Sequence, residues 1–455
     1  MTINRLKPTV IDRERLAALR QSEDVAFRDR TPKSAAAHER ARAHMPNGVP
    51  MTWMAGLWRT PPIYIDSGAG PYFTDIDGNR YLDFNLCDLS MTVGYGNAVV
   101  AEASDRQARR GATFLAPTED ASVVSEHLAA RMRLAFWQYT LSASDSNTEV
   151  IRIARFITQR PKIVIFGGHY HGHIEETLVR DDHGRTVAET AGLSPGSAAH
   201  TIILPFNDLD ALARVLAVGD VALVLTEPAM TNCNVILPDP GFHEGLRTLT
   251  RRHGTLLCID EAHTFQFAYG GLSREWALEP DFIVLGKGLG SGIAFSMYGM
   301  SEAVALSVSA NLDGDAGPRG IALGGTTYGS ALALAVARAM LEDIMTPVAH
   351  ARLNELGRRL ADGLEAAFQH RALPWTAFRC GPRSGYCLAP VLPRTGDEGY
   401  QSLDIELIDA RRVYMANRGI WDAVASAGPQ ASIAHTEADV DRYLTTSGEF
   451  LDAIL

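Results

Sequence analysis

One lysine of this sequence lies inside an apolar, glycine-rich stretch, FIVLGKGLGSG, residues 282–292. Lysine is scarce in the chain: the only four are Lys7, Lys33, Lys162 and Lys287, and arginine supplies the rest of the 42 basic residues. A buried ammonium group is costly, and lysine, unlike arginine, loses its proton readily when it is desolvated. Lys287 is therefore a candidate catalytic amine. The alternative is a structural lysine at the end of a strand, whose aliphatic side chain is buried while its ammonium group reaches water.

A carboxylate follows another apolar run in the same way. TLLCI, residues 255–259, is followed by Asp260 and Glu261. An amine and a carboxylate at two strand ends match the needs of pyridoxal phosphate, which takes an amine for its Schiff base and a carboxylate beside its pyridine nitrogen. The carboxylate keeps that nitrogen protonated, so the ring can accept electrons from a bond broken at the substrate carbon. The alternative for Asp260 is the N-cap of a helix, a role that aspartate fills well.

The phosphate of such a cofactor needs backbone N–H groups at the start of a helix, with small hydroxyl side chains beside them. LSASDSNTEVIRIARF, residues 141–156, offers Ser142, Ala143 and Ser144 ahead of an apolar-periodic helix. A second loop of small residues, LGGTTYGSALALA (323–335), also opens a helix. Serine-rich helix starts are common, so residues 142–144 indicate a phosphate site only in combination with Lys287 and Asp260.

The run KIVIF is followed by GGHYHGH, residues 167–173. Tyr170 is a candidate to stack on one face of the cofactor ring. The alternating His169, His171 and His173 have a second interpretation as metal ligands, because His-rich tracts can bind metals. No matching cluster of cysteine or glutamate accompanies them, so we expect no metal.

Short apolar runs alternate with helical stretches from about residue 100 onward. Fully apolar strands separated by helices are typical of an α/β fold whose mostly parallel sheet is covered on both faces. Ligands of such sheets bind beyond the carboxyl ends of the strands, which is where the polar candidates fall. The runs expected to be strands are KIVIF (162–166), HTIILPF (200–206), VALVLTEP (221–228), TLLCIDEA (255–262) and FIVLGKG (282–288).

The two ends of the chain have other patterns. Charged, alanine-rich residues 10–45 predict an N-terminal helix, and residues 61–84 alternate with period two about an Asp-Ile-Asp-Gly turn and predict an antiparallel hairpin. Residues 331–370 predict a long helical region. We expect three segments: 1–98, the N-terminal helix and hairpin of a small domain; 99–335, a large cofactor-binding domain; and 336–455, the C-terminal part of the small domain.

Composition narrows the class of protein. The net charge of −11 and the pI of about 5.7 argue against nucleic acid as a partner. Five scattered cysteines without a CxxC pair predict neither a disulfide framework nor a zinc site. Residues 1–20 lack the apolar core of a signal peptide, and no window holds eighteen uninterrupted apolar residues. We expect a cytoplasmic protein with no membrane association.

In this order the motifs resemble those of the class III pyridoxal-phosphate aminotransferases, of fold type I, over about residues 45–445. The most similar branch includes glutamate-1-semialdehyde aminomutase and the β-amino-acid and D-phenylglycine aminotransferases. Each motif is modest alone, but their order is specific. They are DIDGNRYLDF (75–84), GGHYHG (167–172), Glu227-Pro228, Asp260-Glu261, LGKGLGSGIAFSMYG (285–299), GGTTYGS (324–330) and SIAHTEADVDRYL (432–444).

The resemblance implies a fold type I enzyme with a smaller α+β domain built from both chain ends. It implies that Lys287 and Asp260 are catalytic, and that the enzyme is a homodimer with a shared active site in which Thr326 reaches the phosphate of the neighbouring subunit. The candidate cofactor-binding residues are Ser142, Ala143, Ser144, Tyr170, Glu227, Asp260, Ala262, His263, Lys287 and Thr326.

Two departures concern the cofactor. The family's S-G-T-E phosphate motif is Ser-Ala-Ser-Asp at 142–145, which keeps the backbone donors and a hydroxyl. The family's D-E-V is D-E-A, so Ala262 leaves space at the ring face that His263 could fill.

A third departure concerns the substrate. Relatives hold a substrate carboxylate with an arginine shortly after a P-G-G-V-like turn, but here PNGV (46–49) is followed by PMTWMAGLW. Trp53, Met54 and Trp58 are therefore candidate substrate residues of an apolar pocket, although the tryptophans could instead pack the junction between domains.

The expected function is transfer of an amino group from an amine or amino acid, with a bulky apolar or aromatic group, to a carbonyl acceptor. An aminomutase or racemase on the same scaffold is the nearest alternative. A catalytically silent binding protein is the alternative from another class, and the presence of Lys287 argues against it.

Overall fold

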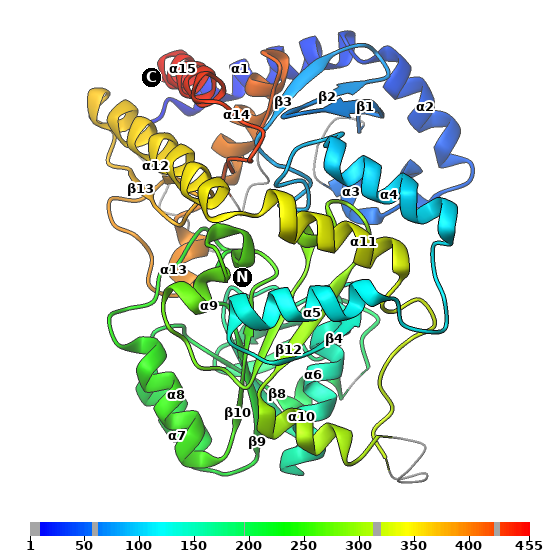
Figure 1. The fold of residues 1–455 in the computed structure, drawn as a ribbon. Coiled ribbons are helices and arrows are strands. Elements are labelled where there is room, and N and C mark those ends of the chain that lie inside the picture. Colours follow the sequence, from blue (N-terminus) through cyan, green and yellow to red (C-terminus); the bar gives the residue numbers. More distant parts are fainter. Residues whose placement is uncertain (1–9, 57–61, 195, 313–319, 423–427) are drawn as a thin grey trace. The chain divides into compact units, whose positions relative to one another are not determined.

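The computed structural model describes residues 10–56, 62–194, 196–312, 320–422 and 428–455 of the chain (Figure 1). The chain forms two compact units, and each unit is assembled from separate stretches of sequence. Unit 1 comprises Met1–Asn97, Arg352–Leu392 and Gln401–Leu455, and unit 2 comprises Ala98–Ala351 and Pro393–Tyr400. The division into segments 1–98, 99–335 and 336–455 stays a prediction.

Unit 2 contains a seven-stranded sheet in the order β4-β12-β11-β10-β9-β5-β8. Only β12 runs against its two neighbours, so the prediction of a mostly parallel sheet is confirmed. All five apolar runs form strands. The strands are β4 (Phe136–Thr140), β5 (Lys162–Phe166), β8 (Thr201–Leu204), β9 (Val221–Thr226), β10 (Leu256–Asp260), β11 (Phe282–Leu285) and β12 (Ser296–Met300).

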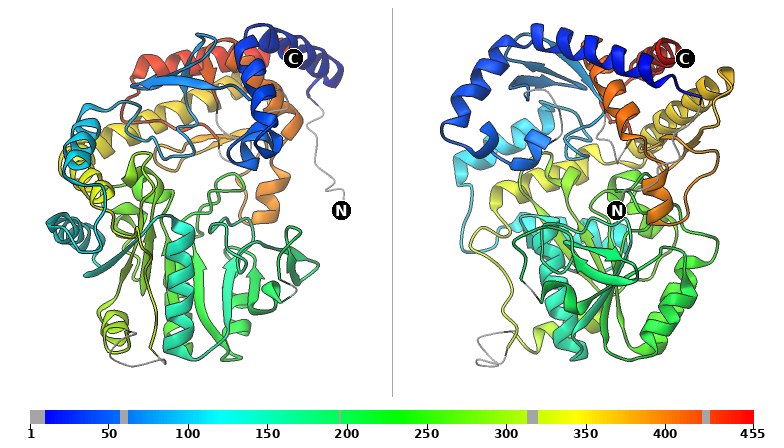
Figure 2. Two further views of the ribbon diagram at one scale, coloured as in Figure 1. Left: turned by 90° about the vertical axis from the view of Figure 1, so that its right-hand side faces the viewer. Right: turned by 180° about the vertical axis from the view of Figure 1, so that it is seen from behind.

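Successive residues of the buried strands serve opposite faces of this sheet. Ile163 and Ile165 pack with helix α6, whereas Val164 and Phe166 pack with α7 and α8, and Figure 2 shows α6 running alongside the strands. The sheet is therefore covered on both faces. The helices of unit 2 are α4 (Ala98–Arg110), α5 (Glu119–Met132), α6 (Ala143–Thr158), α7 (Leu209–Leu216), α8 (Phe242–His253), α9 (Gly271–Glu275), α10 (Glu302–Ser309) and α11 (Ala331–Ala339).

Two smaller elements complete unit 2. A two-stranded hairpin joins β6 (Val179–Asp182) to β7 (Arg185–Ala188). The short helix α13 (Gly396–Gln401) lies almost wholly in the late stretch 393–400 that belongs to this unit.

Unit 1 contains a four-stranded sheet in the order β1-β2-β3-β15. The predicted hairpin is confirmed as β2 and β3, and the Asp75 carboxylate fixes its turn by accepting the N–H groups of Asp77 and Asn79. The elements of unit 1 are α1 (Arg13–Asp29), α2 (Pro32–Arg42), α3 (Thr52–Gly56), β1 (Ile65–Ala69), β2 (Tyr72–Asp75), β3 (Arg80–Asp83), β13 (Thr376–Phe378), β14 (Gly385–Cys387), α14 (Ile405–Asn417), β15 (Ile420–Trp421) and α15 (Glu437–Ile454). Helix α12 (Pro347–His370) begins in unit 2 and continues into unit 1.

The long helical predictions differ from the structure at prolines. The single N-terminal helix is two helices, because Pro32 starts α2 and cannot continue α1. The region 331–370 is likewise broken: a π-helical turn, Met340–Ile344, follows α11, and α12 starts afresh at Pro347. No helix in the described part of the chain is long and apolar enough to cross a membrane.

Candidate active site

Five strands of unit 2 bring the candidate residues to one edge of the sheet. β4, β5, β9, β10 and β11 run in the same direction, so their carboxyl ends lie together, where open α/β sheets bind ligands. The residues at these ends are 142–144 after β4, 167–173 after β5, 227 after β9, 260–263 at the end of β10 and 287 after β11.

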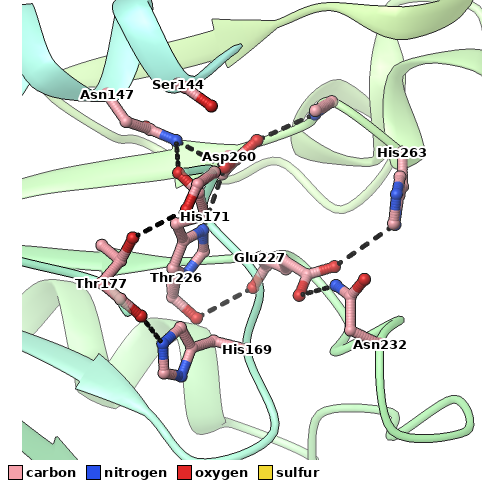
Figure 3. A network of polar contacts seen from close by, with 12 residues as sticks. Ser144, Asn147, His169, His171, Thr177, Thr226, Glu227, Asn232, Asp260 and His263 are labelled. Carbon is pink, nitrogen blue, oxygen red and sulfur yellow. Dashed lines mark hydrogen bonds and ion pairs between the residues drawn. The ribbon is translucent and has the colours of Figure 1, made fainter. Parts of the chain in front are cut away.

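Asp260 is held by several hydrogen bonds and is 4% exposed. Its Oδ2 atom accepts a hydrogen bond from the Asn147 amide and lies 2.9 Å from Nδ1 of His171, while Oδ1 accepts the N–H of Ala262 (Figure 3). Burial acts to raise the pKa of this carboxyl, but His171, Asn147 and Ala262 together hold it below the ordinary value. The N-cap alternative is wrong, because the next helical turn is capped by His263. An ionised Asp260 is suited to keep a proton on a nitrogen placed against it.

His171 and Asn147 both contact Asp260, and sequence analysis did not identify either as its partner. His171 was considered only as a metal ligand, and among the described residues no cluster of three or more His, Cys, Asp or Glu could hold a metal ion. Asn147 donates both to the His171 carbonyl and to Asp260, so it joins α6 to two strand ends. Its place one turn into α6, on the buried face, is the only signal that the sequence carries.

The start of α6 forms a cradle for an anion. Ser142 is the N-cap, and its Oγ accepts the N–H of Asp145 at 3.2 Å and donates to the Asp145 carboxylate at 2.8 Å. The Ser144 Oγ accepts the N–H of His173. Gly172, at φ 102°, comes so close that a Cβ there would lie 2.3 Å from Ser144 Oγ. The N–H groups of the first helical turn and the helix dipole favour a phosphate at this position.

Lys287 has an unusual backbone for a lysine. Its φ is 48°, in the left-handed region that costs an ordinary residue about 1–2 kcal/mol. Strain of this kind is found where the surroundings and the function demand it. A Cβ on the preceding Gly286 would lie 3.5 Å from the Cβ of Ala143, so the lysine strand end packs directly on the α6 cradle.

A chain of buried hydroxyl groups fixes this packing. The hydroxyls of Thr140 and Ser146 lie 2.8 Å apart, those of Ser146 and Ser296 lie 2.9 Å apart, and Ser296 donates to the carbonyl of Leu285. All three side chains are fully buried. The chain connects β4, α6 and β12 to the residue two positions before Lys287, and so sets the distance between the cradle and the amine.

Glu227 and His263 form a second polar group beside Asp260. Glu227 is 3% exposed and His263 5% exposed, and Asn232 donates to Oε1 of Glu227 at 3.0 Å (Figure 3). Burial raises the pKa of the Glu227 carboxyl to about 7, although the charge of His171 and the hydrogen bond from Thr231 oppose the rise. Ala262 is also buried, between Asp260 and His263.

The remaining candidates lie at the surface of their own units. Tyr170 is 51% exposed in the loop after β5, and Thr326 is exposed in the loop before α11. In unit 1, Trp53 is 51% exposed and Met54 41% exposed. Trp58 lies outside the described residues, so its predicted role stays a prediction.

The residues at this edge of the sheet match the chemical parts of pyridoxal phosphate. The ionised, fully hydrogen-bonded Asp260 suits a protonated ring nitrogen, and the α6 cradle suits a phosphate. Lys287, held against the cradle through Gly286, suits the carbonyl carbon. The donor set of unit 2 therefore fits this cofactor.

Comparison with known proteins gives a consistent result. Residues 55–373 match the family model described as aminotransferase class-III. A glutamate-1-semialdehyde 2,1-aminomutase of Brevibacillus brevis is 32% identical over 395 residues, which cover 85% of this chain and 90% of that protein.

Solved structures are similar over almost the whole chain. A glutamate-1-semialdehyde aminomutase of Pseudomonas aeruginosa has a TM-score of 0.92 at 38% identity, with 98% of this chain and 100% of that chain covered. A lysine-to-alanine variant of the same protein was solved in complex with PMP. An omega-transaminase of Sphaerobacter thermophilus has a TM-score of 0.85 at 27% identity, with 92% and 97% covered.

Proposed function

We propose a specific reaction for this chain, which belongs to the class III aminotransferases and is a pyridoxal-phosphate enzyme of fold type I. The enzyme moves an amino group from an amine or amino acid to a separate carbonyl acceptor. The observation that carries the proposal is the packing of Gly286, the residue before Lys287, on Ala143 of the α6 cradle, at the same edge of the sheet as the ionised carboxylate of Asp260.

Each residue of the site has a distinct part in this reaction. Pyridoxal phosphate, when bound, supplies a ring that accepts the electrons of the broken bond. Nζ of Lys287 would take the proton from the substrate carbon as general base and, once protonated, would be the general acid for the cofactor carbon. Asp260 holds a proton on the ring nitrogen, while Ser142, Ala143 and Ser144 hold the phosphate. Tyr170 stacks on the ring.

The preferred amino compound carries a bulky apolar or aromatic group. The support is the run PMTWMAGLW after the turn at 46–49, which has Met51 or Met54 where relatives of the resembled branch keep an arginine, and which adds Trp53 beside them. A carboxylate in a pocket needs a paired cation, and arginine supplies two parallel hydrogen bonds for it. Comparing kcat/KM for an aromatic amine and for a short dicarboxylic amino acid tests this. A tenfold preference for the dicarboxylate contradicts it.

The second candidate function is an aminomutase, which returns the amino group to the same molecule. It is favoured by the relatives named glutamate-1-semialdehyde aminomutase at 32% and 38% identity. The two functions differ in one requirement: an aminotransferase turns over only when a second carbonyl compound is present, whereas an aminomutase needs none beyond its own substrate.

The deciding experiment combines the visible absorbance of the loaded protein with a lysine substitution. Lys287→Ala is expected to lose the visible band and at least about a hundredfold in turnover, because no other amine replaces it as general base. Lys162→Ala is the matched control, since Lys162 starts β5 and pairs with Asp220 at 2.7 Å. Wild-type turnover by the Lys287 variant would contradict the assignment.

A homodimer with a shared active site is the assembly we propose. Thr326 is exposed, and its loop leads into α11, where the N–H of Leu332 donates to the carbonyl of Ala112. Two exposed apolar side chains follow Ala112 closely: Phe114 is 48% exposed and Leu115 is 93% exposed. An apolar surface beside the Thr326 loop supports contact with a second copy there.

A further inference from the structure

Three buried side chains next to Asp260 form a continuous chain of hydrogen bonds. Thr231 donates its hydroxyl and its backbone N–H to Oε2 of Glu227. The same hydroxyl lies 2.5 Å from Nδ1 of His263. Thr231 is completely buried, and the other two side chains are at most 5% exposed. The hydroxyl is thus the link between a carboxyl group and an imidazole ring, both shielded from water.

The direct route between the two end groups is too long for a hydrogen bond. Nδ1 of His263 and Oε2 of Glu227 are 4.0 Å apart, beyond the usual donor–acceptor range of about 2.7–3.2 Å. The hydrogen-bonded route from the carboxyl to the ring therefore runs through the Thr231 hydroxyl.

A hydroxyl group has a single proton, so this chain can be polarised in only two ways. When Glu227 is ionised, Thr231 donates to it, and Nδ1–H of His263 donates to Thr231; Nε2 is then an acceptor. When Glu227 is protonated, it donates to Thr231, and Thr231 donates to an unprotonated Nδ1; Nε2 then carries the proton and is a donor. Each arrangement satisfies every group of the chain.

We propose that Glu227, acting through the Thr231 hydroxyl, decides which ring nitrogen of His263 carries the proton. This inference deepens the proposed function, because it rests on His263 lying at the cofactor: the relay then sets whether His263 presents an acceptor or a donor there. Glu227 and Thr231 are positioning residues, since they act through another side chain.

Glu227 would change the relay from one state to the other near neutral pH. The pKa of the Glu227 carboxyl is raised to about 7, first by burial. Neighbouring groups also affect the pKa of Glu227. Asp260 raises it, whereas His171 and the hydrogen bonds from Thr231 and Asn232 lower it. The other titratable groups that face the carboxyl are His263, Cys233 and Tyr400.

The test follows the two ring nitrogens of His263 by 15N NMR in the full chain labelled with ring-15N histidine, with His263→Gln to assign the signals. In the wild type the proton is expected to move from Nδ1 at pH about 8.5 to Nε2 at pH about 5.5. Thr231→Val removes the hydroxyl at constant shape, and the exchange should be lost. Thr231→Ser restores the hydroxyl and should restore the exchange.

Thr226→Val is the matched control. Its hydroxyl is also fully buried and donates to the backbone carbonyl of Glu227, so its loss should leave the exchange intact. The relay is overturned if the wild-type pattern stays constant across this pH range, if the exchange survives Thr231→Val, or if Thr231→Ser abolishes it as fully as valine does.

A parallel measurement separates this inference from the proposed function. The same samples are titrated with pyridoxal phosphate, and the visible band is recorded. A protein that shows the tautomer exchange but never develops the band keeps the relay and loses the proposed function. A protein with the band and a constant tautomer loses the relay alone.

Discussion

Asp260 illustrates how a buried carboxylate is kept charged. Burial alone would favour the neutral acid, yet three donors from three segments reach its two oxygens: Asn147 from α6, His171 from the loop after β5, and the N–H of Ala262 just after β10. Hydrogen bonds to the charged form lower a pKa. Three hydrogen bonds therefore stabilise the negative charge of Asp260. A site that holds a proton on a ligand nitrogen needs such a charge.

Asp260→Asn tests that role. The variant is expected to bind pyridoxal phosphate but to lose about a hundredfold or more in kcat, because an amide cannot keep the ring nitrogen protonated. Cofactor binding is measured by the visible band and kcat by steady-state turnover. Asp220→Asn, at a surface carboxylate paired with Lys162, is the control. A loss below about threefold would sink the role.

Individual residues differed in how far the sequence could predict them. Lys287 and Asp260 were predictable, because a charge placed after an apolar strand is costly and so calls for a reason. His171 and Thr231 were not, since their meaning depends on contacts 89 and 32 residues along the chain. The sequence around His171 and Thr231 does not indicate that their partners are Asp260 and His263.

The short helix α13 packs its backbone directly on two segments near the candidate site. A Cβ on Gly396 would lie 2.2 Å from the carbonyl oxygen of Gly167, and one on Gly399 would lie 2.2 Å from the carbonyl oxygen of Cys233. Backbone thus meets backbone at two points, one at the start of the Gly167–His173 loop and one just after Thr231. Only glycine permits this approach.

Gly396→Ala is therefore expected to displace the loop that carries His171. We expect at least a tenfold loss of affinity for pyridoxal phosphate, measured by titration of the visible band, because a shift of about 1 Å in a site can cost about a hundredfold in rate. Gly196→Ala is the control, since nothing lies within 4 Å of a Cβ there. Equal affinities for the two variants would show that the contact is not needed.

Element boundaries were predictable to the extent that the signal is local. The strands β5, β9, β10 and β11 were identified by their apolar residues, which must be buried on both faces. The breaks at Pro32 and Pro347 were visible in the sequence but were outweighed by helical spacing on either side. The packing of α13 on Gly167 and Cys233 had no local signal, because it depends on two glycines, Gly396 and Gly399, that reach these residues only in the fold.

For the whole molecule, buried titratable groups set opposing pH trends. Burial raises the pKa of Asp83 to about 6 and that of Glu227 to about 7, so the stability these acids contribute is present at low pH and is lost as the pH rises through these values. Burial lowers the pKa of His169 and His435 to about 4, so their contribution is present above about pH 6.5 and is lost as the pH falls toward 4.

Asp83→Asn isolates one of these trends. The asparagine oxygen can still accept the N–H groups of Asn85 and Leu86, but it does not ionise. Relative to the wild type, the variant should gain stability as the pH rises from about 4 to about 6, by up to about 3 kcal/mol, and no more above about 7. Urea unfolding midpoints across this range measure the difference. A constant difference would contradict the raised pKa.

The proposed dimer also belongs to this scale. Leu115→Asp places a charge on a 93% exposed apolar side chain, three residues after Ala112, whose carbonyl accepts the N–H of Leu332. The change should shift the protein toward monomers in sedimentation and weaken its affinity for pyridoxal phosphate. Val218→Asp is the control, because Val218 is 70% exposed in the turn after α7. A fully active wild-type monomer would rule the shared site out.

The interleaving of the two units has a consequence for the order in which the protein is completed during synthesis. Residues 98–351 leave the ribosome well before residues 393–400, which belong to the same unit and cover Gly167 and Cys233. Domains begin to fold as they emerge, so unit 2 must wait, with its ligand edge incompletely supported, while residues 352–392 are added. Unit 1 waits longer, because the strand β15 beside β3 and the helix α15 come last. The carboxyl edge of the unit 2 sheet is therefore complete only after residues 393–400 have been made and have packed on Gly167 and Cys233. Cofactor binding is expected to follow the packing of this late segment.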